Sequence, residues 1–160
     1  MKHPILALTA ILFCSAAAHA QVTYRGHAYG SFGFEAPSKG SIGDIMTSGF
    51  GGDYIVWKGA GFGGDAHYAF PRREPSDGIG LAAVHGSYHF VNQYNPKKFV
   101  PFGNAGYTLA FRSGTANFAH IGAGFIYWFN DDFGFRFEWR NTFNTNELFL
   151  SGIRLGVTFK

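Results

Sequence analysis

The sequence predicts an all-β fold in which eight antiparallel strands, connected up and down as a meander, close into one β-barrel. Three observations predict it. Apolar and polar residues alternate with period two through eight segments, the period of a strand whose faces meet different surroundings. Clusters of Gly, Pro, Asn, Asp and Ser separate the segments as turns. The apolar face is rich in aromatic residues, whereas the other face carries Gly, His and Arg.

Residues 1–20 are expected to be a signal peptide that is cleaved from the mature chain. A short basic start is followed by an apolar run at residues 5–13, and Ala18-His19-Ala20 matches the A-x-A cleavage pattern. The apolar run is too short for a membrane-anchoring helix, which needs roughly 20 residues. Export of the protein from the cytoplasm follows from this assignment.

Residues 21–160 are expected to form one domain without disulfides. The one cysteine of the chain, Cys14, lies in the leader. Beyond Lys2, the basic residues nearly balance the 10 acidic ones, and no basic run is interleaved with aromatics. Nucleic acid is therefore excluded as a partner. No run of 18 or more apolar residues follows the leader, so a membrane location would require a closed barrel.

The first four expected strands alternate clearly between two residue classes. Residues 24–35 set Gly, Ala and Phe against Arg, His, Tyr and Glu. After a loop of Pro, Ser and Gly, residues 48–57 place Phe, Tyr and Val opposite Asp, Ile and Trp. Residues 61–70 follow a turn at 58–60, and residues 79–90 follow a charged loop; both set aromatic and aliphatic side chains against His, Asp and Ser.

The last four expected strands show the strongest alternation. Residues 99–112 and 117–129 alternate Tyr, Leu, Ile and Phe with Asn, Thr, His and Gly. A turn at 130–132 leads into residues 133–143, where Phe and Trp alternate with Arg and Glu. Residues 149–159 end the chain with Ile, Leu, Val and Phe against Arg and Gly. The even strand number places both termini at one end of the barrel.

The placement of lysines and aromatics predicts that the apolar face meets lipid. A lysine at mid-membrane depth on that face would cost about 2 to 4 kcal/mol. All five lysines after the leader fall in expected loops, turns or the terminus: Lys39, Lys58, Lys97, Lys98 and Lys160. Aromatic side chains near strand ends are expected to form interfacial girdles: Phe50, Tyr68, Phe70, Phe90, Phe111, Tyr127, Phe129, Phe143 and Phe159.

The opposite face is expected to fill the lumen with paired charges. An eight-stranded barrel is just wide enough for side chains, and unpaired charges there would be costly. Glu138 lies between Arg136 and Arg140 on one face, and Arg154 of the next strand is expected to reach the same carboxylate. The expected network comprises Arg25, Glu35, Asp53, Asp65, Arg112, Arg136, Glu138, Arg140 and Arg154.

All five histidines after the leader share the inward parity, namely His27, His67, His85, His89 and His120. No metal site and no cofactor are predicted, because strand neighbours about 7 Å apart need a third group to converge on one ion. His85-Gly-Ser87 resembles the His-x-Ser of outer-membrane lipid A deacylases, but Tyr88 stands where their motif has Asn. No acid follows within about forty positions, so an esterase is disfavoured.

The eight strands, the Phe99-Val100-Pro101-Phe102 opening of the fifth strand and the aromatic end of the last strand resemble the small outer-membrane β-barrel proteins, the OmpA-type transmembrane domain and its OmpX-like relatives. The resemblance implies a monomer in the bacterial outer membrane, surrounded by lipopolysaccharide and phospholipid. It also implies insertion by the outer-membrane assembly machinery, which reads a terminal Phe; here Phe159 is followed by Lys160.

These observations predict a non-enzymatic outer-membrane barrel with a closed polar lumen. Its expected role is envelope integrity, or surface interaction through the loops. A narrow gated pore for small solutes or ions is one alternative. A soluble exported barrel that binds an apolar ligand inside an aromatic interior is another, and the placement of the lysines disfavours it.

Overall fold

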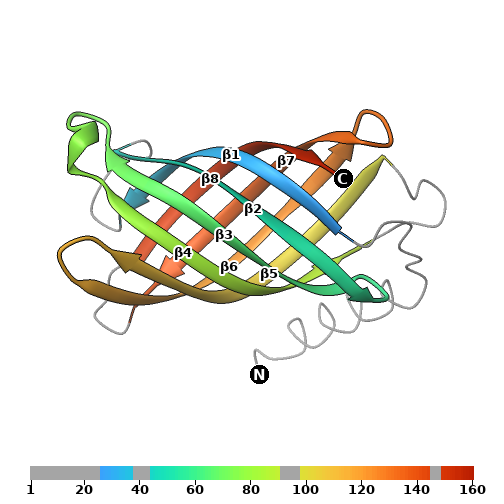
Figure 1. Ribbon diagram of the computed structural model, residues 1–160, viewed down its shortest axis with the longest axis horizontal. Helices are drawn as coiled ribbons and strands as arrows, with labels where there is room; N and C mark the ends of the chain where they lie inside the picture. The colour runs from blue at the N-terminus through green and yellow to red at the C-terminus, as the bar shows by residue number, and fades with distance from the viewer. Residues whose placement is uncertain (1–25, 38–43, 91–97, 145–148) are drawn as a thin grey trace, which may run out of the picture.

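The protein folds into a closed antiparallel β-barrel (Figure 1). Its strands are β1 (Gly26–Pro37), β2 (Ile45–Trp57), β3 (Ala60–Pro71), β4 (Ile79–His89), β5 (Phe99–Phe111), β6 (Thr115–Trp128), β7 (Phe133–Phe143) and β8 (Phe149–Phe159). Each strand pairs with the next in the chain, and β8 pairs with β1. The prediction of an eight-stranded up-and-down barrel is confirmed.

The computed structural model describes residues 26–37, 44–90, 98–144 and 149–160, without the side chain of Phe149. The expected signal peptide at residues 1–20 lies outside the described residues, as do Arg25, Lys39 and Lys97. Within the described part of the chain, no helix is long and apolar enough to cross a membrane.

Two strands begin earlier than the alternation predicts. β2 begins at Ile45, three positions before the expected start, because Ile45 pairs with Glu35 of β1 and with Pro71 of β3. β6 begins at Thr115, which pairs with Phe111 of β5. Backbone pairing, with both neighbouring strands for β2 and with β5 alone for β6, thus continues into segments that were predicted to be loops.

The register of the eight strands fixes their tilt. Following paired residues once around the barrel from Gly26 leads back to Ala36 of the same strand, a shear of ten residues. With a rise of about 3.3 Å per residue and a strand spacing of about 4.8 Å, this shear gives a tilt of about 40°. The residues on the path are Tyr54, Phe62, Gly86, Ala105, Ile121, Asn141 and Ser151.

Two short turns, between β2 and β3 and between β6 and β7, lie at the end that holds the C-terminus (Figure 1). Lys58 and Gly59 join β2 to β3 with φ of 46° and 90°, the positive pair that a two-residue type I′ hairpin requires. Between β6 and β7, Asn130 Oδ1 accepts hydrogen bonds from the backbone N–H of Asp132 (2.9 Å) and of Phe133 (2.7 Å). Both turns use the residues predicted for them.

At the other end of the barrel, the connection between β3 and β4 contains a 3-10 helix at Pro75–Asp77. The Tyr68 hydroxyl donates to the carbonyl of Pro75 (3.2 Å) and accepts from the N–H of Gly78 (3.1 Å). An outward aromatic of β3 thereby holds this connection against the barrel wall.

The two faces of the sheet are inverted relative to a soluble protein. On β7, the Arg136 and Arg140 side chains are buried in the lumen, whereas Trp139 points outward and is 52% exposed. Trp139 Nε1 donates to Ser151 Oγ on β8 (3.0 Å), which satisfies its polar atom on the outer face. The same arrangement holds around the barrel, where the large exposed side chains are apolar and most of the buried ones are polar.

Most aromatics predicted as girdle residues lie at strand ends. Phe50 is an exception: because β2 begins at Ile45, Phe50 is the sixth of its 13 residues and lies near mid-strand, so its assignment to a girdle was wrong. The aromatics within three residues of a strand end are Tyr68, Phe70, Phe90, Phe111, Tyr127, Phe129, Phe143 and Phe159.

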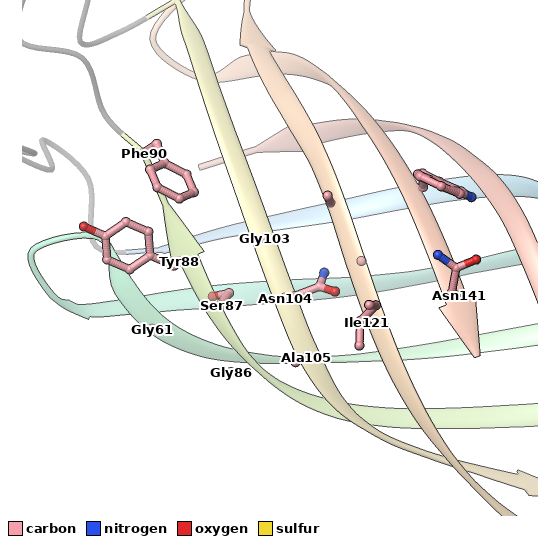
Figure 2. A pocket seen from close by; sticks show the side chains of 13 residues that line it. Gly61, Gly86, Ser87, Tyr88, Phe90, Gly103, Asn104, Ala105, Ile121 and Asn141 are labelled. Carbon is pink, nitrogen blue, oxygen red and sulfur yellow. The ribbon is translucent and has the colours of Figure 1, made fainter. Parts of the chain in front are cut away.

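The outer face carries a shallow groove of about 630 Å³ that extends from Gly61 of β3 across β4 to β7 (Figure 2). Small residues of β4, β5 and β6 form its floor, including Gly86, Gly103 and Ala105. Tyr88 and Trp139 stand at its sides. The groove is almost entirely apolar in lining, so it continues the character of the surrounding outer face.

Candidate functional site in the barrel lumen

A network of buried charged side chains occupies the middle of the lumen. Three strands at the start of the chain supply carboxylates, and the last two strands supply guanidiniums and one more carboxylate. All seven residues lie at inward positions, and at most 7% of the surface of each is exposed. They are Glu35 on β1, Asp53 on β2, Asp65 on β3, Arg136, Glu138 and Arg140 on β7, and Arg154 on β8.

Glu138 is the centre of this network. Arg136 Nη2 donates to its Oε2 (3.1 Å), and Arg140 Nε donates to its Oε1 (2.8 Å). Asn104 of β5 donates from Nδ2 to the same Oε1 (3.0 Å). Three hydrogen bonds to one buried carboxylate are the kind of compensation that a charge needs away from water. The role of Asn104 was not predicted, although its inward parity was visible in the sequence.

Two arginines extend from Glu138 to the aspartates across the barrel. Arg140 forms a bidentate pair with Asp65, with Nη1–Oδ1 at 3.1 Å and Nη2–Oδ2 at 2.8 Å. Arg136 donates to Asp53 Oδ2 (3.3 Å). The Arg136 guanidinium also lies between two rings, 4.1 Å from the Tyr29 centroid and 4.0 Å from that of Phe102. Ion pairs and ring stacking together fix this side chain.

Arg154 belongs to the network, but its partners differ from the prediction. It lies directly opposite Glu138 in the β7–β8 register. Its guanidinium nevertheless pairs with Glu35 through Nη2 (2.8 Å) and lies 3.7 Å from Asp65. The side chain extends toward β1 because Gly33 leaves space there: a Cβ at Gly33 would lie 2.9 Å from Arg154 Cγ.

Two other predicted members of the network are not placed in it. Arg112 follows the last residue of β5, and its side chain is 50% exposed and pairs with Asp77 (2.5 Å). Its assignment to the lumen was wrong, because β5 ends at Phe111 and no longer imposes an inward direction on the next side chain. Arg25 lies outside the described residues.

All five predicted histidines are buried in the lumen, in two groups. His27, His85 and His89 lie toward the end that holds the C-terminus, and His85 Nε2 is 2.9 Å from Asp53 Oδ1. His67 Nε2 lies 3.3 Å from Asp65 Oδ1, and His120 Nδ1 is 2.8 Å from Thr108 Oγ1. The histidines therefore extend the charge network along the barrel axis.

An apolar cluster closes the lumen on the side of the charges that faces the C-terminus. This cluster was not predicted from the sequence. Val100, Phe102, Ile126 and Trp128 of β5 and β6 are 3% exposed or less and contact one another. Their inward parity could have revealed them, since each follows the alternation of its strand. At the opposite end, a cavity of about 240 Å³ is bounded by Glu35 and Arg154 and by apolar side chains.

Gly63→Ala is expected to destabilise the barrel by about 1 to 3 kcal/mol through overpacking. The new Cβ would lie 2.6 Å from both Asp53 Oδ1 and His85 Nε2, so it would separate that pair. Urea unfolding followed by tryptophan fluorescence measures the change. Gly86→Ala is the matched control, because its Cβ would point outward with nothing within 4 Å. Equal stability of the two variants would contradict this account of Gly63.

Comparison with known proteins identifies the fold through structure and not through sequence. No protein-family model matches the chain, and no curated protein matches it. Among solved structures, the chain resembles Neisserial surface protein A, with a TM-score of 0.60, 17% identity and coverage of 84% of this chain and 95% of that one.

Two further solved structures give a similar result. The N-terminal β-barrel domain of Pseudomonas aeruginosa OprF has a TM-score of 0.59 and 16% identity, over 84% of this chain and 98% of that one. Ail, the attachment invasion locus protein of Yersinia pestis, has a TM-score of 0.58 and 12% identity, over 85% and 99%. The chain thus has the fold of the small eight-stranded outer-membrane β-barrel proteins.

Proposed function

We propose that the chain is an integral β-barrel of the bacterial outer membrane with a closed lumen and a structural role in the envelope. This proposal rests on the arrangement of the two faces of the sheet, with apolar side chains on the outside and charged side chains in the lumen. Side chains such as Val84, Phe62 and Trp139 are more than half exposed on the outer face, while Arg136 and Glu138 are buried inside. A bilayer accommodates such an outer face, whereas water would not.

A closed lumen is favoured over a narrow pore. The buried arginines pair with carboxylates across the barrel, so the network fills the cross-section at mid-height. On the side of the network that faces the C-terminus, the apolar side chains of Phe102, Ile126 and Trp128 fill the lumen. An ion that crosses the barrel would have to displace both layers, which an eight-stranded barrel has little width to permit.

Two rival functions lose support from the same geometry. A soluble barrel that binds an apolar ligand needs its aromatic face inside, but the rings of β7 face outward and the interior of that strand is charged. A lipid hydrolase would need its nucleophile at the lipid face. His85 and Ser87 instead lie buried in the lumen, which supports a protein without enzymatic activity.

The proposed partners follow from this location. Lipopolysaccharide and phospholipid would contact the outer face, including the groove over β4 to β7. The outer-membrane assembly machinery would insert the chain, with β8 ending in Phe159. The barrel is proposed to be a monomer, because its sheet is closed and leaves no strand edge for a second copy. Interaction through the loops would add a surface role at the end that holds Pro75–Asp77.

The test is membrane fractionation together with gel mobility. The protein expressed in a Gram-negative host is expected to remain in the outer-membrane fraction after carbonate and salt washes. In detergent gels, the unheated barrel is expected to migrate differently from the boiled chain, because the closed sheet resists detergent until it is heated. Release by the washes as a folded, soluble protein would contradict the proposal.

A further inference from the structure

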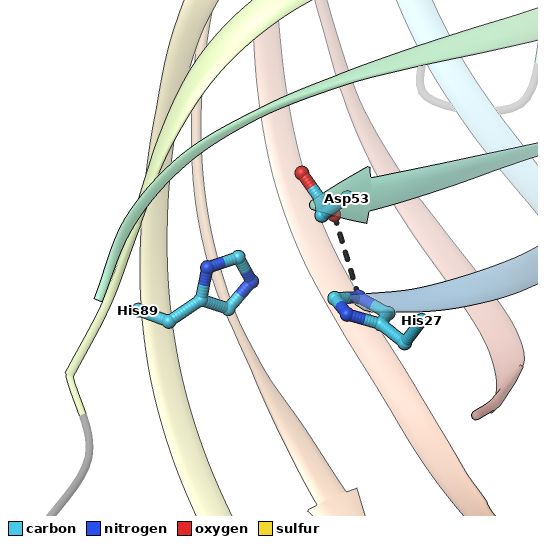
Figure 3. A group of neighbouring side chains, drawn as sticks. All are labelled: His27, Asp53 and His89. Atoms are coloured by element: carbon cyan, nitrogen blue, oxygen red, sulfur yellow. Dashed lines mark ion pairs between the residues drawn. The ribbon is translucent and has the colours of Figure 1, made fainter. Parts of the chain in front are cut away.

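We propose that the lumen binds one divalent transition-metal ion, with Zn²⁺ as the reference ion, between His27, Asp53 and His89. Each of these residues offers one ligand atom, and the three atoms lie within 4.8 Å of one another. All three side chains are buried at the end of the lumen that holds the C-terminus. Figure 3 shows the two imidazoles and the carboxylate facing a common space.

The strand register explains why three separate strands converge at this point. His27 of β1 lies directly opposite Asp53 of β2, and their side chains approach to 3.4 Å. His89 comes from β4, beyond the intervening strand β3. The inward positions of β3 at this level are Gly61 and Gly63, so β3 places no side chain between His89 and the other two. Because of this gap, His89 can serve as the third ligand, which neighbouring positions of one strand could not provide.

The donor set suits a transition metal. Zn²⁺ binds imidazole nitrogen at about 2.0 to 2.1 Å and carboxylate oxygen at about 2.0 to 2.2 Å, with four ligands in a tetrahedron. Donors around such an ion lie about 3.3 Å apart, so a movement of at most about 1.5 Å brings any two of the three donor atoms to that separation. Two imidazoles favour Zn²⁺, Cu²⁺ or Ni²⁺ over Mg²⁺ or Ca²⁺, which prefer oxygen ligands. A water molecule would complete the tetrahedron.

The state of His89 is an independent indication of a ligand. This side chain is 0% exposed, and neither of its ring nitrogens has a hydrogen-bond partner among the described residues. Buried polar atoms are normally paired, and each unpaired one is costly. The ring stacks on Phe102 with centroids 5.6 Å apart and meets the edge of His27 at 5.4 Å. Packing thus holds the imidazole beside the site, and a metal ion would satisfy one nitrogen.

The charge balance of the lumen also favours a cation. Among the described residues, four buried carboxylates face three buried guanidiniums. Asp53 Oδ1 is 2.9 Å from His85, which would orient the carboxylate from outside the metal shell. Arg136 lies 3.3 Å from Asp53 Oδ2 and opposes a second positive charge there. Its other ion pair, with Glu138 at 3.1 Å, gives the guanidinium an alternative partner when metal binds.

Zinc binding to the purified, refolded barrel in detergent tests the proposal. After dialysis against a chelator, Zn²⁺ alone is added, and bound metal is measured by equilibrium dialysis. We expect one ion per barrel and a higher midpoint of thermal unfolding, since a ligand of the folded state stabilises it. In His89→Phe, which keeps a ring against Phe102, the association constant should fall by at least about 100-fold.

His120→Phe is the matched control, because it removes a buried histidine of β6 that contacts Thr108 and not the proposed ligands. It should bind Zn²⁺ like the unmodified protein. A measurement on the unmodified protein guards against misfolding of the variants: Zn²⁺ should shift the imidazole NMR signals of His27 and His89 and leave those of His67 in place. Absence of Zn²⁺ uptake, unchanged affinity in His89→Phe or an unshifted His89 signal would each overturn the proposal.

Discussion

Glu138→Gln is expected to lower the free energy of unfolding by about 3 to 5 kcal/mol, the largest effect we predict for one substitution. The side chain keeps its size, but the negative charge between Arg136 and Arg140 disappears. Each arginine then retains one aspartate across the barrel, while repulsion between the two guanidiniums is no longer offset. Urea unfolding in detergent, followed by the gel-mobility shift, measures the loss.

Glu74→Gln is the control, because Glu74 is exposed in the connection between β3 and β4. It should change stability by less than about 0.5 kcal/mol. A loss below about 1 kcal/mol for Glu138→Gln would contradict a structural role for the network. In planar bilayers, the closed lumen predicts that a folded Glu138→Gln barrel conducts no more than the unmodified protein. A rise in conductance would favour the narrow gated pore.

Val84→Arg is expected to cost about 2 to 4 kcal/mol when the barrel is folded in a lipid bilayer. Val84 is 65% exposed on the outer face and is the sixth of the 11 residues of β4, so it lies at the middle of the apolar band. A charged group there would enter hydrocarbon. Reversible unfolding from phospholipid vesicles measures the cost.

Val56→Arg makes the same change at the same exposure of 65%, but one residue before the end of β2. Its cost should be about 0 to 1 kcal/mol, because the guanidinium reaches the interface. The difference between the two variants therefore reports depth in the membrane and not the loss of a valine. Equal, small effects at both positions would indicate that water surrounds the outer face.

The period-two alternation was sufficient to predict the fold and to assign faces, because strand geometry alone determines which side chains point inward. It predicted the burial side of Arg136, Glu138 and Arg140 in β7 without knowledge of their partners. The alternation did not predict where each strand begins and ends. Phe50 and Arg112 were misassigned because backbone pairing extends β2 beyond its alternating core and ends β5 before Arg112.

The partners inside the lumen could not be predicted from the face pattern. A long side chain on a tilted strand reaches groups several residues away along the barrel, so the register of all eight strands decides its contacts. Arg154 illustrates this point, since it faces Glu138 across the sheet yet pairs with Glu35. The convergence of His27, Asp53 and His89 depends in the same way on the glycines of β3 that lie between them.

The buried acids and bases are also separated along the chain. Asp53 and Asp65 belong to the first half, and their arginine partners Arg136 and Arg140 are 83 and 75 residues away. During biogenesis, the early hairpins therefore carry negative groups whose counterions have yet to be added. The arginines that pair with these groups arrive with the last two strands, and β8 also closes the sheet by pairing with β1. A chain that ends before these strands would lack both the arginines and the closed sheet. A partly completed barrel is therefore expected to be unstable in hydrocarbon.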